Sequence, residues 1–101
     1  MSATYQRADG EHIIPVRPGY CDRLQWRLRH RLPMWTVYAP TTREYPGLWV
    51  ARMHICLPEA RPTRFVIAQE SLSALRDALP EGLTCIGRSP GDAPEIVEVW
   101  I

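Results

Sequence analysis

Residues 48–57, LWVARMHICL, carry an apolar side chain at every second position from Trp49 to Leu57. Successive side chains of an extended chain point to opposite faces, so this spacing places one row of apolar side chains on a single face of a strand. That row consists of Trp49, Ala51, Met53, Ile55 and Leu57. A strand of this kind buries its apolar face against another layer and pairs with neighbours, which predicts a half-buried sheet.

Further strands are predicted on both sides of this segment. Residues 34–39, MWTVYA, are aromatic and β-branched, and the turn-rich stretch PTTREYPG separates them from residues 48–57. We expect these two strands to form an antiparallel pair. Their long connection carries Arg43, Glu44 and Tyr45, where a partner can reach them. Residues 64–69, 83–88 and 95–101 are the remaining predicted strands.

One helix is predicted over residues 71–79. Ser71 is a suitable N-cap, and Leu72, Leu75 and Leu79 repeat at helical spacing before the sequence PEG. A helix placed on a mainly antiparallel sheet is the most economical arrangement for these elements. We therefore expect a small α+β fold whose sheet has four to five strands, with one short helix on a face and an N-terminal arginine-rich helix or strand.

The arginine-rich element, residues 22–32 (DRLQWRLRHRL), fits two structures. As a helix it has Asp22 as N-cap and Pro33 as terminator, with Leu24, Leu28 and Leu32 on one stripe and Arg23, Arg27 and Arg31 on another. As a strand it places Trp26 on the face of the leucines, opposite the arginines. The segment has no β-branched residue, and Leu, Arg and Gln favour helices. We favour the helix.

The chain length of 101 residues fits one domain, residues 1–101, with room for one site. Residues 1–20 contain Pro15 and Pro18 and little periodicity, so we expect an irregular, partly mobile lead-in. No apolar run is long enough to cross a membrane, and the polar start lacks the apolar segment of a signal peptide. We expect a cytoplasmic protein that makes no membrane contact.

Charge is unevenly distributed along the chain. All 12 basic residues are arginine. Residues 1–64 carry ten arginines and five acids, whereas residues 65–101 carry two arginines and six acids. Such asymmetry arises from charge pairing within the fold or from a basic and an acidic face that serve partners.

The sequence contains no pattern that specifies a reaction, a metal or a cofactor. His54 and Cys56 share a strand face, but two ligands do not make a tetrahedral metal site. No nucleophile motif, phosphate-binding glycine loop or paired-acid spacing is present. The odd number of widely spaced cysteines favours buried, reduced thiols. We therefore expect a non-enzymatic protein that uses no cofactor.

A binding function remains, and its candidate residues are arginines and aromatic residues. These types are enriched at protein interfaces, which favours a protein-binding surface for a larger host protein or ribonucleoprotein complex. The alternative is nucleic-acid binding, in which the arginines neutralise phosphates and the tryptophans stack on bases. The candidate binding residues are Arg23, Trp26, Arg27, Arg29, Arg31, Trp35, Arg43 and Tyr45.

Residues 35–101, with the segments WTVYAP, REYPGLWVAR and LPEGLTCIGRSPGDAPEIVEVWI, resemble short reading frames of bacteriophages and prophages of GC-rich bacteria. The resemblance covers about two thirds of the chain. Small phage proteins without enzymatic signatures often bind and block host machinery, and CRISPR inhibitors are one such group. By analogy, the resemblance implies a phage-encoded inhibitor of a host defence protein or ribonucleoprotein, and it transfers no functional residue.

Overall fold

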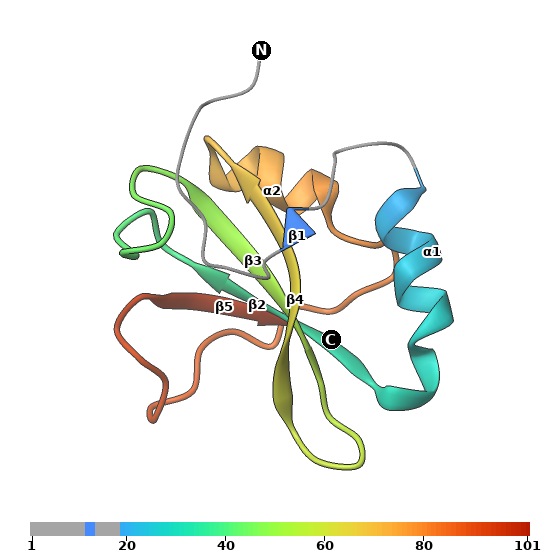
Figure 1. Ribbon diagram of the computed structural model, residues 1–101. Coiled ribbons are helices and arrows are strands. Elements are labelled where there is room, and N and C mark those ends of the chain that lie inside the picture. The colour runs from blue at the N-terminus through green and yellow to red at the C-terminus, as the bar shows by residue number, and fades with distance from the viewer. Residues whose placement is uncertain (1–11, 14–18) are drawn as a thin grey trace.

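Five strands form one sheet in the computed structural model, which describes residues 12–13 and 19–101 (Figure 1). The strands are β1 (His12–Ile13), β2 (Pro33–Tyr38), β3 (Trp49–Ile55), β4 (Arg61–Gln69) and β5 (Ile96–Trp100), in the spatial order β1-β4-β3-β2-β5. The four longer strands are antiparallel, and β1 pairs with β4 in parallel. The predicted α+β fold and the antiparallel pairing of β2 with β3 are confirmed.

Two short helices cover one face of the sheet. They are α1 (Tyr20–Arg27), which a 3₁₀ turn η1 (Arg29–Arg31) follows, and α2 (Leu72–Ala78). The register places Trp35 opposite Met53 and Val37 opposite Ala51, so their side chains point to the helices. The core between the layers consists of Cys21, Trp35, Val37, Ala51, Met53, Ile67, Leu75 and Leu79.

The other face of the sheet is covered in part by the β2–β3 loop. Tyr45 and Leu48 of this loop pack on Val50 and Val66 and form a second, smaller buried cluster. The rest of that face carries polar side chains from alternate positions of β2 and β3, among them Tyr38, Arg52 and His54. The two faces of the sheet thus differ in chemistry, because one is closed by helices and the other is partly open.

The expected helix over residues 22–32 is confirmed as a helix, but both of its ends are corrected. The N-cap is Gly19, at φ 80°, and not Asp22, whose carboxylate accepts a hydrogen bond from the backbone N–H of Glu81 at 2.9 Å. The helix stops at Arg27, and the stripe of three leucines therefore does not reach Leu32, which is exposed. The chain continues after Arg27 as the 3₁₀ turn η1, and Pro33 disfavours helical geometry only at Leu32, the residue before it.

The α2 prediction is confirmed in detail. Ser71 caps the helix, accepting the backbone N–H of Ala74 at 3.1 Å on its hydroxyl oxygen, and Leu75 and Leu79 are buried. The predicted strand over residues 83–88 is wrong. Only Cys85 forms a bridge, to Trp100, and Gly87 turns the chain away at φ 73°. The segment still covers the outer edge of β5, because the backbone N–H of Ile86 donates to Val99 of β5 and that of Thr84 donates to Ile101.

Most of the irregular lead-in expected over residues 1–20 lies outside the described residues. Within it, His12–Ile13 pair with Phe65 and Val66 of β4. Among the described residues, no helix has the length and apolar character that crossing a membrane requires.

Candidate functional site

Helix α1 presents a basic side to solvent and an apolar side to the core. Leu24 packs against the core, whereas Arg23 and Arg27 are exposed. The two arginines lie four residues apart and therefore occupy the same stripe of the helix. This arrangement follows from the sequence, because the apolar and basic residues of the segment repeat at the same helical spacing.

At the end of α1, Trp26 and Arg29 form an ordered pair on the surface. The Trp26 side chain is 65% exposed, and the guanidinium carbon of Arg29 lies 3.8 Å from the centroid of its ring. The same guanidinium donates a hydrogen bond to the carbonyl of Trp26 at 2.7 Å. Both side chains are therefore held in place before any partner binds.

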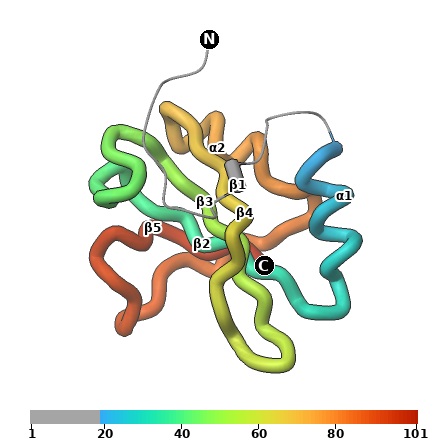
Figure 2. Tube along the Cα trace, in the orientation of Figure 1, coloured from blue at the N-terminus to red at the C-terminus, as the bar shows by residue number. Residues whose placement is uncertain are grey.

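Two exposed leucines lie beside η1. Leu32 is 53% exposed and Leu57, in the β3–β4 turn, is 44% exposed. The carbonyl of Arg31 accepts the backbone N–H of Leu57 at 3.2 Å, which fixes the turn beside η1. Figure 2 shows this turn projecting from one end of the sheet. We name the whole set the α1-end surface: Arg23, Trp26, Arg27, Arg29, Arg31, Leu32 and Leu57.

Leu32 has an unusual backbone. Its φ is 51°, in the left-handed region that a leucine rarely adopts, because its Cβ crowds the following carbonyl. This conformation costs on the order of 1–2 kcal/mol and is found most often at functional sites. It turns the chain from η1 into β2 and leaves an apolar side chain in solvent.

The arginines of the α1-end surface are not neutralised within the described part of the chain. None of Arg23, Arg27, Arg29 and Arg31 forms an ion pair with a described residue. The explanation of the cluster as a face paired with the protein's own acids is therefore not supported by these residues. Their positive charge remains available to a partner.

The structure separates three of the sequence-predicted residues from this surface. Trp35 is fully buried in the core, where its indole N–H donates to the side-chain oxygen of Gln25 at 2.9 Å. Tyr45, in the β2–β3 loop, is also buried, against Val50 and Val66, and Arg43 is exposed on the same loop. The other five predicted residues, from Arg23 to Arg31, lie on α1 and η1, with the Arg23 guanidinium beside Gly19 at the start of the helix and Arg29 against Trp26 at its end.

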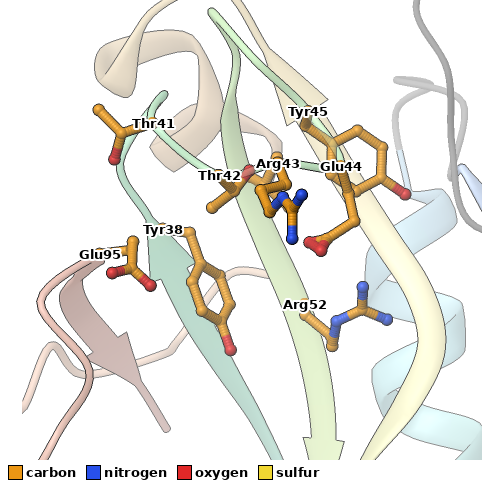
Figure 3. Close-up of a pocket in the computed structure, with 9 residues that line it drawn as sticks. Tyr38, Thr41, Thr42, Arg43, Glu44, Tyr45, Arg52 and Glu95 are labelled. Carbon is orange, nitrogen blue, oxygen red and sulfur yellow. The ribbon is translucent and has the colours of Figure 1, made fainter.

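Arg43 and Tyr45 belong to a pocket of about 590 Å³ on the partly open face of the sheet. Figure 3 shows Arg43 and Glu44 directed from the loop toward the sheet side on which Tyr38 and Arg52 stand. Burial raises the pKa of Tyr38. The phenol therefore stays protonated at neutral pH and can donate a hydrogen bond. The pocket is lined by Tyr38, Thr41, Thr42, Arg43, Glu44, Tyr45, Val50, Arg52 and Glu95.

A second pocket of about 620 Å³ adjoins the first through Arg52. Its lining contains Arg61 and Arg64 from β4, which the sequence reasoning placed in or beside a turn and did not consider as binding residues. Leu32 and Leu57 were also missed, because both appeared as members of apolar stripes. The spacing of Arg61 and Arg64 around a Pro-Thr pair is the signal that could have drawn attention to them.

Glu98 forms the most extensive polar cluster among the described residues, and this cluster is structural. Its two carboxylate oxygens accept from Arg76 Nε at 2.9 Å and from Arg76 Nη2 at 2.8 Å, and Trp100 Nε1 donates at 3.0 Å. The thiol of Cys85 lies 4.0 Å away. These contacts tie α2 and the segment at Cys85 to β5, and the hydrogen bonds from Arg76 hold the pKa of Glu98 below its ordinary value.

The cysteines are free in the structure, but only Cys21 is buried, while Cys56 is half-buried and Cys85 is exposed. Burial, with a smaller contribution from Asp22, raises the pKa of Cys21 to about 11 and keeps its thiol protonated. His54 lies 3.3 Å from the Thr36 hydroxyl, and burial lowers its pKa. Within the described residues, no group of three or more His, Cys, Asp or Glu side chains is placed to hold a metal ion.

Comparison of the chain with family models, with curated proteins and with solved structures found no match.

Proposed function

We propose that the chain is a non-enzymatic protein-binding module whose α1-end surface docks on a larger protein or ribonucleoprotein complex. The observation that carries this proposal is the exposure of Trp26, Leu32 and Leu57 among arginines that no described residue neutralises. Exposed apolar side chains close together are characteristic of interaction sites. Tryptophan and arginine are also the residue types that most often dominate binding energy at protein interfaces.

The chemistry of the surface defines the partner. The planar guanidinium group of arginine can donate two hydrogen bonds to one carboxylate, so the partner should present an acidic surface. Trp26 and Leu32 require an apolar recess within that surface. Nucleic acid alone offers no counterpart to the two leucines, and one face of Trp26 is already covered by Arg29. A protein partner therefore fits this surface better than a nucleic acid does. The resemblance to phage reading frames suggests inhibition of a host defence protein, such as a CRISPR component, as the outcome of docking.

Charge reversal on α1 should abolish docking and leave the fold intact. We expect Arg23→Glu with Arg27→Glu to lower the recovery of a partner protein by at least about tenfold, because like charges across an interface cost several kcal/mol. Both arginines are exposed, so the free energy of unfolding should change by no more than about 1 kcal/mol. The measurement is affinity capture from a nuclease-treated lysate of the native host, quantified by mass spectrometry.

The chain offers a matched control for this experiment. Arg61→Glu with Arg64→Glu changes the net charge equally, also at exposed positions, but in the second pocket. We expect this variant to retain the partner. Equal loss from both double variants would indicate a nonspecific charge effect, and undiminished capture by the α1 variant would refute the proposed docking surface.

A further inference from the structure

The two pockets share Arg52 and together offer a binding groove that the proposed docking does not use. On β3, Val50 lines the first pocket, Arg52 lines both, and Ile55 near the end of the strand lines the second. We name the two pockets together the sheet-face groove.

One end of the sheet-face groove is strongly basic. The second pocket is lined by three arginines, Arg52, Arg61 and Arg64, and by no acidic residue. Arg52 is held in position by a hydrogen bond from its Nη1 to the carbonyl of Thr63 at 2.9 Å. Arg61 and Arg64 form no ion pair with a described residue. Three guanidinium groups with no acid among them favour binding of phosphate groups, whose oxygens match the planar donor fork.

The other end of the groove has a different chemistry. Tyr38 is half-buried in its wall and offers an aromatic ring, while Glu44 and Glu95 add two carboxylates. The hydroxyl oxygen of Thr42, which lines the same pocket, is buried without a hydrogen-bond partner among the described residues. Buried polar atoms normally have a partner, so a ligand with donor groups suits this pocket.

We propose that the sheet-face groove binds single-stranded nucleic acid, with phosphates at Arg52, Arg61 and Arg64 and a base against Tyr38. The combination of a basic track with an aromatic platform is the usual one for single strands. The carboxylates of Glu44 and Glu95 can accept hydrogen bonds from the exocyclic amino groups of a base, which the side chains of an acidic peptide do not offer. The paired bases of a duplex cannot reach the wall of such a pocket.

The test is a fluorescence anisotropy titration of the full chain with labelled 12-residue oligocytidylate, at 50 and at 200 mM salt. Three phosphate contacts at a slope of about 0.7 each predict a loss of affinity of roughly 20-fold between the two salt concentrations. Arg61→Glu with Arg64→Glu should weaken binding at least about tenfold. Arg23→Glu with Arg27→Glu should leave the affinity within about twofold, which separates this proposal from the proposed docking function.

A second pair of variants tests the aromatic end of the groove. Tyr38→Ala should weaken binding by roughly 5- to 150-fold, the range for loss of one stacked base, whereas Tyr38→Phe should bind nearly as well as the parent. Circular dichroism establishes that each variant is folded. If Tyr38→Ala is unfolded, the tyrosine fluorescence of the parent is measured instead. We expect the oligonucleotide to quench this fluorescence when it occupies the groove.

Three results would overturn the proposal. The first is absence of salt-dependent binding at 50 mM salt. The second is an equal loss of affinity in the α1 variant and in the Arg61 and Arg64 variant. The third is competition by polyglutamate or by duplex DNA that equals competition by unlabelled oligocytidylate, because the groove would then recognise negative charge and not a single strand.

Discussion

Replacing Trp35 by alanine is expected to destabilise the protein by about 3–5 kcal/mol, the usual cost of removing a large aromatic side chain from a core. Trp35 is fully buried, on β2, which lies between β3 and β5, and its indole N–H is hydrogen-bonded to Gln25 of α1. Its loss leaves a cavity between the sheet and α1. Since domains of this size are stable by only about 5–15 kcal/mol, the variant should melt at least about 12 °C lower than the parent.

Trp26 provides the matched control for this measurement. It lies nine residues earlier in the sequence and is 65% exposed, so Trp26→Ala should change the free energy of unfolding by no more than about 0.5 kcal/mol. Thermal unfolding followed by far-ultraviolet circular dichroism checks both variants. If the melting temperature of the Trp35 variant lay within two or three degrees of that of the parent, Trp35 would not belong to the core between α1 and the sheet.

Replacing Glu98 by glutamine should cost about 1 kcal/mol at neutral pH, because charged hydrogen bonds are lost that solvent around the exposed Arg76 already weakens. The glutamine keeps the shape of the side chain but turns an amide donor toward the donors of Arg76. Since Glu98 ties α2 to β5, the loss affects two elements at once. Glu70→Gln, at an exposed position, is the control and should be neutral.

The effect of this substitution should depend on pH in a defined direction. The pKa of Glu98 is lower in the folded protein than in the unfolded chain, so its stabilising contribution is present in full above the unfolded pKa of about 4.3. It disappears as the pH falls through the folded pKa. Urea unfolding of the parent and of Glu98→Gln should therefore differ at pH 7 and converge toward pH 3. A difference that is the same at both pH values would show that the charge of Glu98 contributes nothing.

Local patterns were sufficient to predict β2, β3 and α2. Alternation identified the buried faces of the strands, and the Ser71 cap with its spaced leucines identified the helix, because these signals depend on neighbouring residues alone. The segment at residues 83–88 has the same local character as a strand. It forms only a bridge at Cys85, since its pairing is decided by the edge of β5 and not by its own composition.

The tryptophans show why the candidate site was predicted only in part. Trp26 and Trp35 both stand near arginines in the sequence, and both were proposed as binding residues. Which one is buried depends on the helical period before Pro33 and on the strand period after it. The sheet-face groove was out of reach for a related reason, because it forms only when β4 pairs with β3 and brings Arg61 and Arg64 beside Arg52.

Site-specific photo-crosslinking tests the central claim, docking through the α1-end surface, most directly. A photoreactive p-benzoylphenylalanine replaces Trp26 in one variant and Ser73, an exposed residue of α2, in the other. Both variants are irradiated in a nuclease-treated lysate of the native host. The account predicts a discrete protein adduct from position 26, at least about tenfold more abundant than any adduct from position 73. No adduct from position 26, or the same adducts in equal amounts from both positions, would contradict it.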